Sequence, residues 1–431
     1  MNEKLFPKPS PADPMPLERW LRVTDRAESG REAFFRGRDD EYRVFQDAVL
    51  NLRDNVIGGG TMIFQGSPGA GKTALMQECM EAVRQHSTFK DPWIAVLVDP
   101  SSLKWPDTVV RSMVSAANAE NERLLNHASD RISAALKNSI EKGRQLLREI
   151  PYRDISVSGA SLGKKESAES PQGLFQHVQP LLRNYHIVVF VDEAQNAVKD
   201  DMTKGVIDCL HRNTQGIPLV TAFFGLSDTE EVLSGRGLSR PPDERVVNLE
   251  LLSHEESSEV VKGVFEAYGF SGSGEEREIW VERLAELSQG WPQHINRVAV
   301  AASRVIVEHG GKIRNEWLEQ TLHNARDRKE DYYRMILRRC SGQSWIYKQL
   351  VLAADQNDGL LNIDQILNIA QYARTKSGEP VKDFLTDALH AGVLMESRDN
   401  PGSYHIPIPS LGDYLRKLTD NPPPDIKLTW A

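Results

Sequence analysis

The stretch FQGSPGAGKTALM, residues 64–76, runs from an apolar segment through a glycine-rich turn into a helical pattern. Glycines allow successive backbone N–H groups to turn inward, and at the start of a helix such groups bind phosphate oxygens. The turn satisfies G-x-x-x-x-G-K-[ST], in which the lysine reaches the β- and γ-phosphates and the hydroxyl holds Mg²⁺. A plain glycine turn is the weaker alternative, because a predicted strand precedes this turn and a helix follows it. The predicted site for ATP and Mg²⁺ comprises Gly66, Ser67, Pro68, Gly69, Ala70, Gly71, Lys72 and Thr73.

A second apolar segment, HIVVFVDEAQ at residues 186–195, ends in two acidic residues. Its β-branched and aromatic residues predict a buried strand, and ligands gather at the carboxyl ends of strands in α/β sheets. Asp192 suits the Mg²⁺ shell, and Glu193 suits the group that polarises an attacking water. The alternative is an acidic pair that ends a strand and caps the next helix. Together with the phosphate-binding turn, the pair favours ATP hydrolysis over anion binding alone.

The alternation of apolar strands and helices along residues 34–250 predicts a parallel sheet covered on both faces, hence an α/β fold. With the glycine-rich turn, this fold resembles that of the P-loop NTPases. Residues 102–150 are predicted to be mostly helical, and residues 155–171 to form a small strand pair and a loop. The four predicted strands fall within residues 58–66, 93–100, 186–195 and 218–225.

Beyond residue 250 the pattern becomes helical, beginning with a capping-box pattern at Ser253 and Glu256. The last 90 residues or so predict three helices and two strands joined by a turn at 400–402, which suggests a winged helix. Five prolines between residues 7 and 16 exclude a regular helix in the N-terminal arm. The expected domains are a proline-rich arm (1–33), the nucleotide-binding core (34–250), a helical lid (251–340), a winged helix (341–420) and a tail (421–431).

The composition of the 431 residues is that of a soluble globular protein of two or three domains, with 40% hydrophobic and 26% charged residues. No signal peptide or apolar run long enough for a bilayer is recognised, so the expected location is cytoplasmic, without a membrane partner. The three cysteines are widely separated and predict buried thiols rather than a disulfide framework. A net charge of −9 gives no signature of non-specific nucleic-acid binding.

The two motifs, the lid and the predicted winged helix resemble AAA+ ATPases, most closely the branch shared by origin-recognition-type, transposition-type and STAND ATPases. The segment FFRGRDDE resembles the box that opens this branch beside the adenine, which makes Gly37 and Arg38 candidate base contacts. The alternative is a solvated charge run that starts a helix. The segment LSQGWPQHINRV resembles the lid segment that senses the γ-phosphate, which implies that Pro292 and His294 lie at the nucleotide.

This chain departs from the family at both of its nucleotide sensors. In the family an arginine follows the proline of the lid segment, whereas in this chain the residue after Pro292 is Gln293. A neutral amide cannot supply the charge of the arginine. Either His294 or Arg297 supplies it, or the lid senses the nucleotide through backbone and packing. The fourth predicted strand ends in Gly225 where the family places a polar sensor; Ser227 or Asp228 could serve, or could simply form a turn and helix cap. Weakened sensors favour nucleotide binding over fast turnover.

The resemblance also implies a homo-oligomer, in which an arginine from a neighbouring subunit stabilises the transferred phosphoryl group. The candidates are Arg236, Arg240 and Arg245, each of which has solvation as its alternative role. Two functions stay open from the sequence. The first is an ATPase that acts on duplex DNA or a DNA-bound partner. The second is a slowly hydrolysing, nucleotide-gated switch that recruits a protein partner through the winged helix.

Charge bears on the choice between these two functions. Residues 341–431 hold eight Lys/Arg against eleven Asp/Glu, a composition that opposes DNA phosphate. The stretch ARDRKEDYYRMILRRC, residues 325–340, carries more positive charge. It predicts either a nucleic-acid patch or a solvated helix with arginines around an apolar stripe.

Overall fold

A computed structural model describes residues 6–22, 31–54, 60–126, 130–150, 170–212, 216–239, 245–375, 378–397 and 400–419. The strand pair and loop predicted for residues 155–171 lie outside these ranges, except for the last two residues, which lead into a helix. The chain divides into two compact units. The first holds Met1–Ser10, Asp39–Gln65 and Leu75–Asn248, and the second holds Pro11–Arg38, Gly66–Ala74 and Leu249–Ala431.

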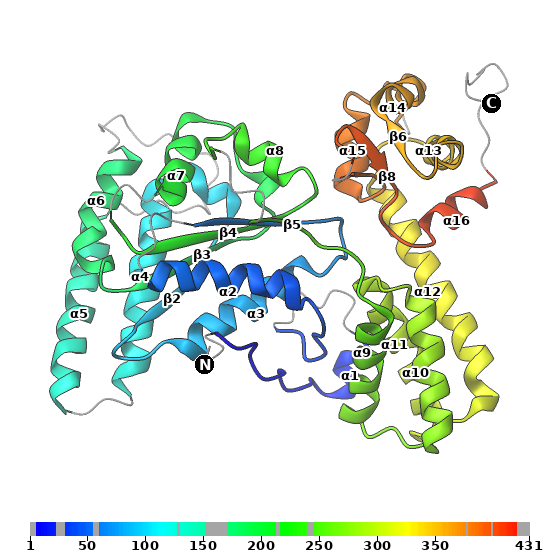
Figure 1. The fold of residues 1–431 in the computed structure, drawn as a ribbon, viewed down its shortest axis with the longest axis horizontal. Helices are drawn as coiled ribbons and strands as arrows, with labels where there is room; N and C mark the ends of the chain where they lie inside the picture. The colour runs from blue at the N-terminus through cyan, green and yellow to red at the C-terminus, as the bar shows by residue number, and fades with distance from the viewer. Residues whose placement is uncertain are drawn as a thin grey trace. The chain divides into compact units, whose positions relative to one another are not determined.

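The first unit is built on a five-stranded sheet in which every pair of neighbours is parallel, in the order β2-β3-β4-β1-β5. This arrangement confirms the predicted α/β fold (Figure 1). The sequence did not predict β5, because three residues are too few to carry a strand periodicity. The strands are β1 (Thr61–Gln65), β2 (Trp93–Val98), β3 (His186–Val191), β4 (Leu219–Gly225) and β5 (Val246–Asn248).

Alternation along the buried strands sends side chains to both faces of the sheet. On one face, Ile187 and Val189 of β3 join a core with the apolar side chains of α4, α6 and α7. On the other face, Phe190 stacks with Phe224 and tilts against Phe45 of α2. Both faces are therefore covered, as the apolar strands predicted. The helices of this unit are α2 (Asp39–Arg53), α3 (Lys72–His86), α4 (Pro106–Leu125), α5 (Asp130–Glu149), α6 (Pro171–Leu182), α7 (Asp201–Arg212) and α8 (Thr229–Ser234).

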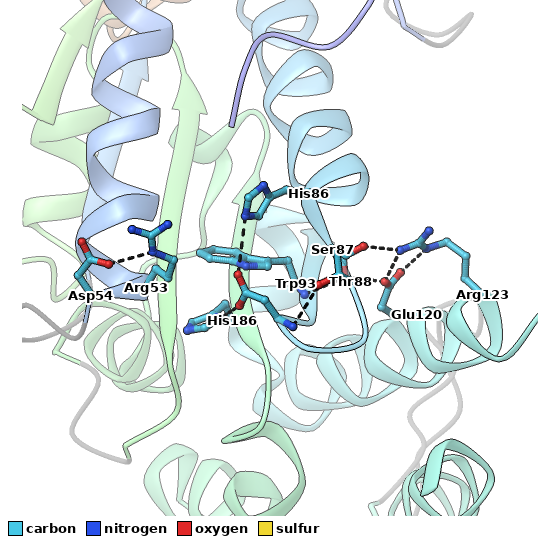
Figure 2. A network of polar contacts seen from close by, with 10 residues as sticks. Arg53, Asp54, His86, Ser87, Thr88, Trp93, Glu120, Arg123 and His186 are labelled. Atoms are coloured by element: carbon cyan, nitrogen blue, oxygen red, sulfur yellow. Dashed lines mark hydrogen bonds and ion pairs between the residues drawn. The ribbon is translucent and has the colours of Figure 1, made fainter. Parts of the chain in front are cut away.

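A polar network fixes the turn between α3 and β2, at the amino ends of β2 and β3 (Figure 2). Ser87 Oγ donates to Glu120 Oε1 at 2.6 Å and accepts from the N–H of Trp93 at 2.9 Å. Asp91 Oδ1 lies 2.9 Å from His186 Nδ1, and the ring of His186 stacks on Trp93. Since α3 begins at Lys72, this network holds the far end of the helix that follows the phosphate-binding turn.

The second unit contains a helical region whose core also takes in part of the N-terminal arm. Trp20 and Phe34 of the arm pack with Tyr268 and the apolar faces of the helices. One turn of helix, α1 (Leu17–Trp20), corrects the prediction that prolines exclude helix here: Pro16 stands at its N-cap, where a missing N–H costs nothing. The other helices are α9 (His254–Ala267), which has the predicted capping box, α10 (Gly274–Ser288), α11 (Pro292–Glu308) and α12 (Leu318–Arg339).

The C-terminal region, residues 341–419, combines helices with a small antiparallel sheet in the order β6-β8-β7. The predicted hairpin is present as β7 and β8, and β6 adds a strand that sequence reasoning did not find. A winged helix stays a prediction for this region. Its elements are α13 (Ser344–Asp355), β6 (Leu361–Asn362), α14 (Ile363–Ala370), α15 (Phe384–Ala391), β7 (Met395–Glu396), β8 (Ser403–His405) and α16 (Leu411–Arg416).

Gly290, in the turn between α10 and α11, predicts a large stability effect. Its φ is +74°, and a Cβ there would lie 2.2 Å from the carbonyl oxygen of Leu252. We expect Gly290→Ala to lower the free energy of unfolding by about 3 kcal/mol or more, since left-handed strain of about 1 kcal/mol adds to a backbone clash. Urea unfolding measures it. Gly269→Ala is the control, because Gly269 has φ +64° but open space around it; equal losses in both variants would contradict the steric argument.

Candidate nucleotide site

The phosphate-binding turn joins β1 to α3, and its backbone requires glycine at two positions. Gly69 and Gly71 have φ of +90° and +92°, in the left-handed region that side chains rarely adopt. At Gly69 there is also no room, because a Cβ would lie 2.6 Å from the hydroxyl of Tyr332. Gly71, the second glycine of the sequence pattern, and Gly69 within it therefore have backbone conformations that favour glycine.

Lys72 is folded back onto this turn. Its Nζ donates to the carbonyl oxygens of Gly66 at 2.8 Å and Ser67 at 3.2 Å, and the residue is only 6% exposed. Thr73, the next residue, is half-buried. Two backbone carbonyl oxygens thus hold the ammonium group at the turn. A triphosphate carries more negative charge than these oxygens and can bind the ammonium group in their place.

Three carbonyl oxygens of the turn accept hydrogen bonds from other segments of the second unit. The hydroxyl of Tyr332 donates to Pro68 at 2.7 Å, the N–H of Gln293 to Gly69 at 3.3 Å, and Arg38 Nη2 to Ala70 at 2.9 Å. Sequence reasoning missed Tyr332, whose only signal was a pair of tyrosines within a strongly charged helix. Burial raises the pKa of Tyr332 to about 12, so its hydroxyl stays a donor at neutral pH.

Arg38 supports the turn, and Gly37 before it has no room for a side chain. Arg38 is 5% exposed, and its Nη2 donates to the carbonyl oxygens of Ala70 and Glu250, at 2.9 and 2.7 Å. Gly37 has φ +69°, and a Cβ there would lie 2.2 Å from Oε1 of Glu256. Arg38 is therefore not part of a solvated charge run. Its contact with the adenine stays a prediction.

The lid segment packs Pro292 near the turn, buries an uncharged His294 and places Arg297 over Tyr332. Pro292 begins α11, with its ring atoms 3.7 Å from where a Cβ of Gly71 would lie. His294 is fully buried and donates from Nδ1 to the carbonyl oxygen of Ser288 at 3.2 Å. Burial, with Lys329 nearby, lowers the pKa of His294 to about 2, so the ring is neutral and cannot replace a sensing arginine. Arg297 lies over the ring of Tyr332, 5.1 Å from its centroid.

His294 predicts an acid sensitivity of folding. Because its pKa in the folded chain lies below the unfolded value of 6.5, only the unfolded chain takes up this proton between pH 6.5 and about 2. The stability that the neutral ring provides is present above pH 6.5 and falls with pH below it. We expect a loss of about 1.4 kcal/mol between pH 7.5 and 5.5 in urea unfolding. His294→Asn keeps a donor and removes the titration, so an identical pH dependence in this variant would contradict the assignment.

Asp192 and Glu193 follow β3 directly, in the first unit. Glu193 adopts left-handed φ and ψ of 51° and 40°, and its N–H donates to Asp192 Oδ1 at 2.9 Å. Its exposed carboxylate accepts from Gln195 Nε2 at 2.5 Å. Glu193 stands at the N-cap of the short helix η3 (Ala194–Asn196), but its side chain makes no capping bond there.

The end of β4 lies next to this acidic pair, because β4 and β3 are neighbours in the sheet. The N–H of Leu226 donates to Gln195 Oε1 at 3.0 Å. Ser227 Oγ is buried without a hydrogen-bond partner in the part of the chain that the structure describes. Asp228 stands at the N-cap of α8 without a side-chain capping bond. Neither residue contacts Glu193 among the described hydrogen bonds, whereas Gln195 does.

Residues 35–221 match a family whose description is AAA ATPase domain. The core has the AAA+ P-loop NTPase fold. The match runs from just before α2 into β4, and it leaves the helical and C-terminal regions outside. Comparison with curated proteins finds no match.

The chain is also similar to solved structures at low identity. The RuvB Holliday junction branch migration motor of Thermotoga maritima is 14% identical, with a TM-score of 0.42 over 93% of this chain and 100% of that one. Cdc6p from Pyrobaculum aerophilum is 12% identical, with a TM-score of 0.38 over 88% of this chain and 94% of that one. A chain of the Drosophila ORC bound to DNA is 15% identical, with a TM-score of 0.41 over 96% of each chain.

The three arginines that the sequence offers as candidates for action between subunits all follow α8. Arg245 precedes β5, and a Cβ at Gly60 would lie 2.5 Å from its guanidinium. Arg236 donates from Nη1 to the carbonyl oxygen of Val232 at 2.7 Å. Arg240 lies outside the described residues. The cysteines are buried free thiols, as predicted. Among the described residues, no helix is long and apolar enough to cross a membrane.

Proposed function

We propose that this protein binds ATP and hydrolyses it to ADP and phosphate. One observation carries the proposal: the Glu193 carboxylate, at the carboxyl end of a central strand, accepts a hydrogen bond from a neutral amide and has no ion pair with a described residue. A carboxylate in this state can accept a proton from water or orient the water for attack. The glycine-rich turn and Lys72 bind the phosphates.

The donor set fits a magnesium ion. The hydroxyl of Thr73 and the carboxylate of Asp192 are hard oxygen ligands, which Mg²⁺ prefers, and it completes its shell with phosphate oxygens and water. Among the described residues, no cluster of three or more His, Cys, Asp or Glu that could hold a metal occurs. Bound there, Mg²⁺ neutralises charge on the phosphate oxygens.

We assign the chain's residues these tasks. Lys72 moves from its backbone oxygens to the β- and γ-phosphates, and Glu193 positions the attacking water. Arg245 or Arg240 of a neighbouring subunit stabilises the charge on the transferred phosphoryl group. Hydrolysis by this scheme requires a homo-oligomer, because the arginine acts from one subunit on the nucleotide of the next.

We propose that the nucleotide cycle acts on DNA or on a DNA-bound partner. A specific observation favours a second candidate, a switch that recruits a protein. Gly392 of the C-terminal region packs closely on Pro68 of the phosphate-binding turn. A Cβ added at Gly392 would lie only 2.5 Å from Cδ of Pro68. That region is acidic overall. In α12, Arg334 is paired with Asp331 at 2.7 Å and Lys329 is buried among backbone and side-chain oxygens, which weakens the case for a nucleic-acid patch.

Steady-state phosphate release with Mg²⁺-ATP, with and without duplex DNA, tests both candidates alongside light scattering for the assembly state. Turnover that DNA stimulates, together with ATP-dependent assembly, supports the DNA-acting ATPase. ATP binding that changes assembly without appreciable turnover, and that is indifferent to DNA, supports the switch. Absence of ATP binding contradicts both.

A further inference from the structure

Gln195 uses both atoms of its side-chain amide at the carboxyl end of the sheet. Its Nε2 donates to Glu193 Oε2 at 2.5 Å, and its Oε1 accepts from the N–H of Leu226 at 3.0 Å. Gln195 is 7% exposed, so solvent competes little for either bond. The amide therefore connects the exposed carboxylate after β3 to the backbone after β4.

The last residue of the neighbouring strand β4, Gly225, leaves room for this amide. A Cβ at Gly225 would lie 2.6 Å from Gln195 Oε1 and 2.2 Å from Thr229 Oγ1. Thr229, which is fully buried, donates to the carbonyl oxygen of Leu226 at 2.6 Å. Both polar groups of Leu226 are thus held, the N–H by Gln195 and the carbonyl by Thr229. The absence of a side chain at Gly225 makes the space for both.

We propose that Gln195 is a positioning residue for ATP hydrolysis, which holds the Glu193 carboxylate in register with the end of β4. The inference rests on the proposed function. An exposed glutamate otherwise samples several rotamers, and a misplacement of about 1 Å at a reacting group can cost about 100-fold in rate. The bond to Leu226 fixes which amide atom faces Glu193, because an accepting Oε1 leaves Nε2 as the donor. A neutral donor orients the carboxylate without a competing charge.

Gln195→Glu separates positioning from folding. The new carboxylate keeps the shape of glutamine and still accepts from Leu226, but it has no donor for Glu193. We expect kcat to fall about 10- to 100-fold, with the KM and the dissociation constant of ATP unchanged within about 2-fold. Asn196→Asp is the matched control, because it adds the same charge one residue further along at an exposed position; its kcat should stay at the parent value.

Two further variants make the assignment specific. Gly225→Ala should lower kcat similarly, because the added methyl displaces the Gln195 amide. In a Glu193→Gln background, Gln195→Glu should cause no further loss, since the group that it positions is already gone. A crystal structure of nucleotide-free Gln195→Glu should show the Glu193 side chain displaced.

The outcomes separate the two claims. If the parent protein binds ATP but does not hydrolyse it, both the proposed function and the positioning role of Gln195 are contradicted. A parent that hydrolyses ATP while Gln195→Glu keeps its kcat overturns the positioning role alone. A Gln195→Glu variant that loses ATP binding or unfolds at a lower urea concentration, in proportion to its loss of rate, shows a structural role instead and equally overturns it.

Discussion

Replacing Glu193 by glutamine is expected to lower kcat for ATP hydrolysis by about 10²- to 10⁴-fold while ATP remains bound with its normal affinity. The amide has nearly the shape of the carboxylate, but it cannot accept the proton of an attacking water. Because the side chain is exposed at the carboxyl end of β3 and carries no capping bond, the substitution removes little stability. Phosphate release measures the rate, and a fluorescent ATP analogue measures the affinity.

Glu231→Gln provides the matched control for this prediction. Glu231 is also exposed and lies in α8, shortly after the end of β4, so the variant removes the same charge from the same unit. Its kcat is expected to equal that of the parent. A Glu193→Gln variant that hydrolyses ATP within about threefold of the parent would exclude Glu193 as base or water-positioning group.

Lys72→Ala is expected to weaken ATP binding by about 100-fold or more. A lysine ammonium that contacts two phosphate groups makes two charge-assisted hydrogen bonds, each worth about 1.5–3 kcal/mol, and alanine retains neither of them. Isothermal titration calorimetry with Mg²⁺-ATP measures the change. The turn should change as well, because the carbonyl oxygens of Gly66 and Ser67 lose the donor that holds them without nucleotide.

Lys348→Ala controls for the removal of a lysine that binds backbone. The Nζ of Lys348 donates to the carbonyl oxygen of Leu418 at 2.7 Å, in the C-terminal region. The variant therefore loses the same kind of bond but no phosphate contact, and its ATP affinity should match that of the parent. An unchanged affinity in Lys72→Ala would remove the glycine-rich turn from the nucleotide site.

The sequence determined those parts of the site that depend on neighbouring residues. Gly69 and Gly71 adopt left-handed conformations that follow from their lack of a side chain, and α3 begins at Lys72, where the pattern places a helix. The run of β-branched and aromatic residues before Asp192 dictated a buried strand, and with it the carboxyl end at which the acidic pair stands. A capping box at Ser253 is likewise a matter of residues three apart.

Only the tertiary structure decided which distant groups contact the glycine-rich turn and the residues after β3 and β4. Tyr332 binds Pro68 across 264 residues of chain, and Leu226 binds Gln195 across 31. From the sequence, a solvated Arg38 and an Arg38 in contact with a nucleotide base were equally well supported. The fold buries Arg38 against the backbone of Ala70. The sequence allowed a positively charged His294, but burial lowers the pKa of the ring to about 2, so it is neutral. Local sequence patterns determine the backbone conformation and the type of charge at a position. The burial of a side chain and its hydrogen-bond partners depend instead on how segments far apart in the chain pack together, which no local pattern specifies.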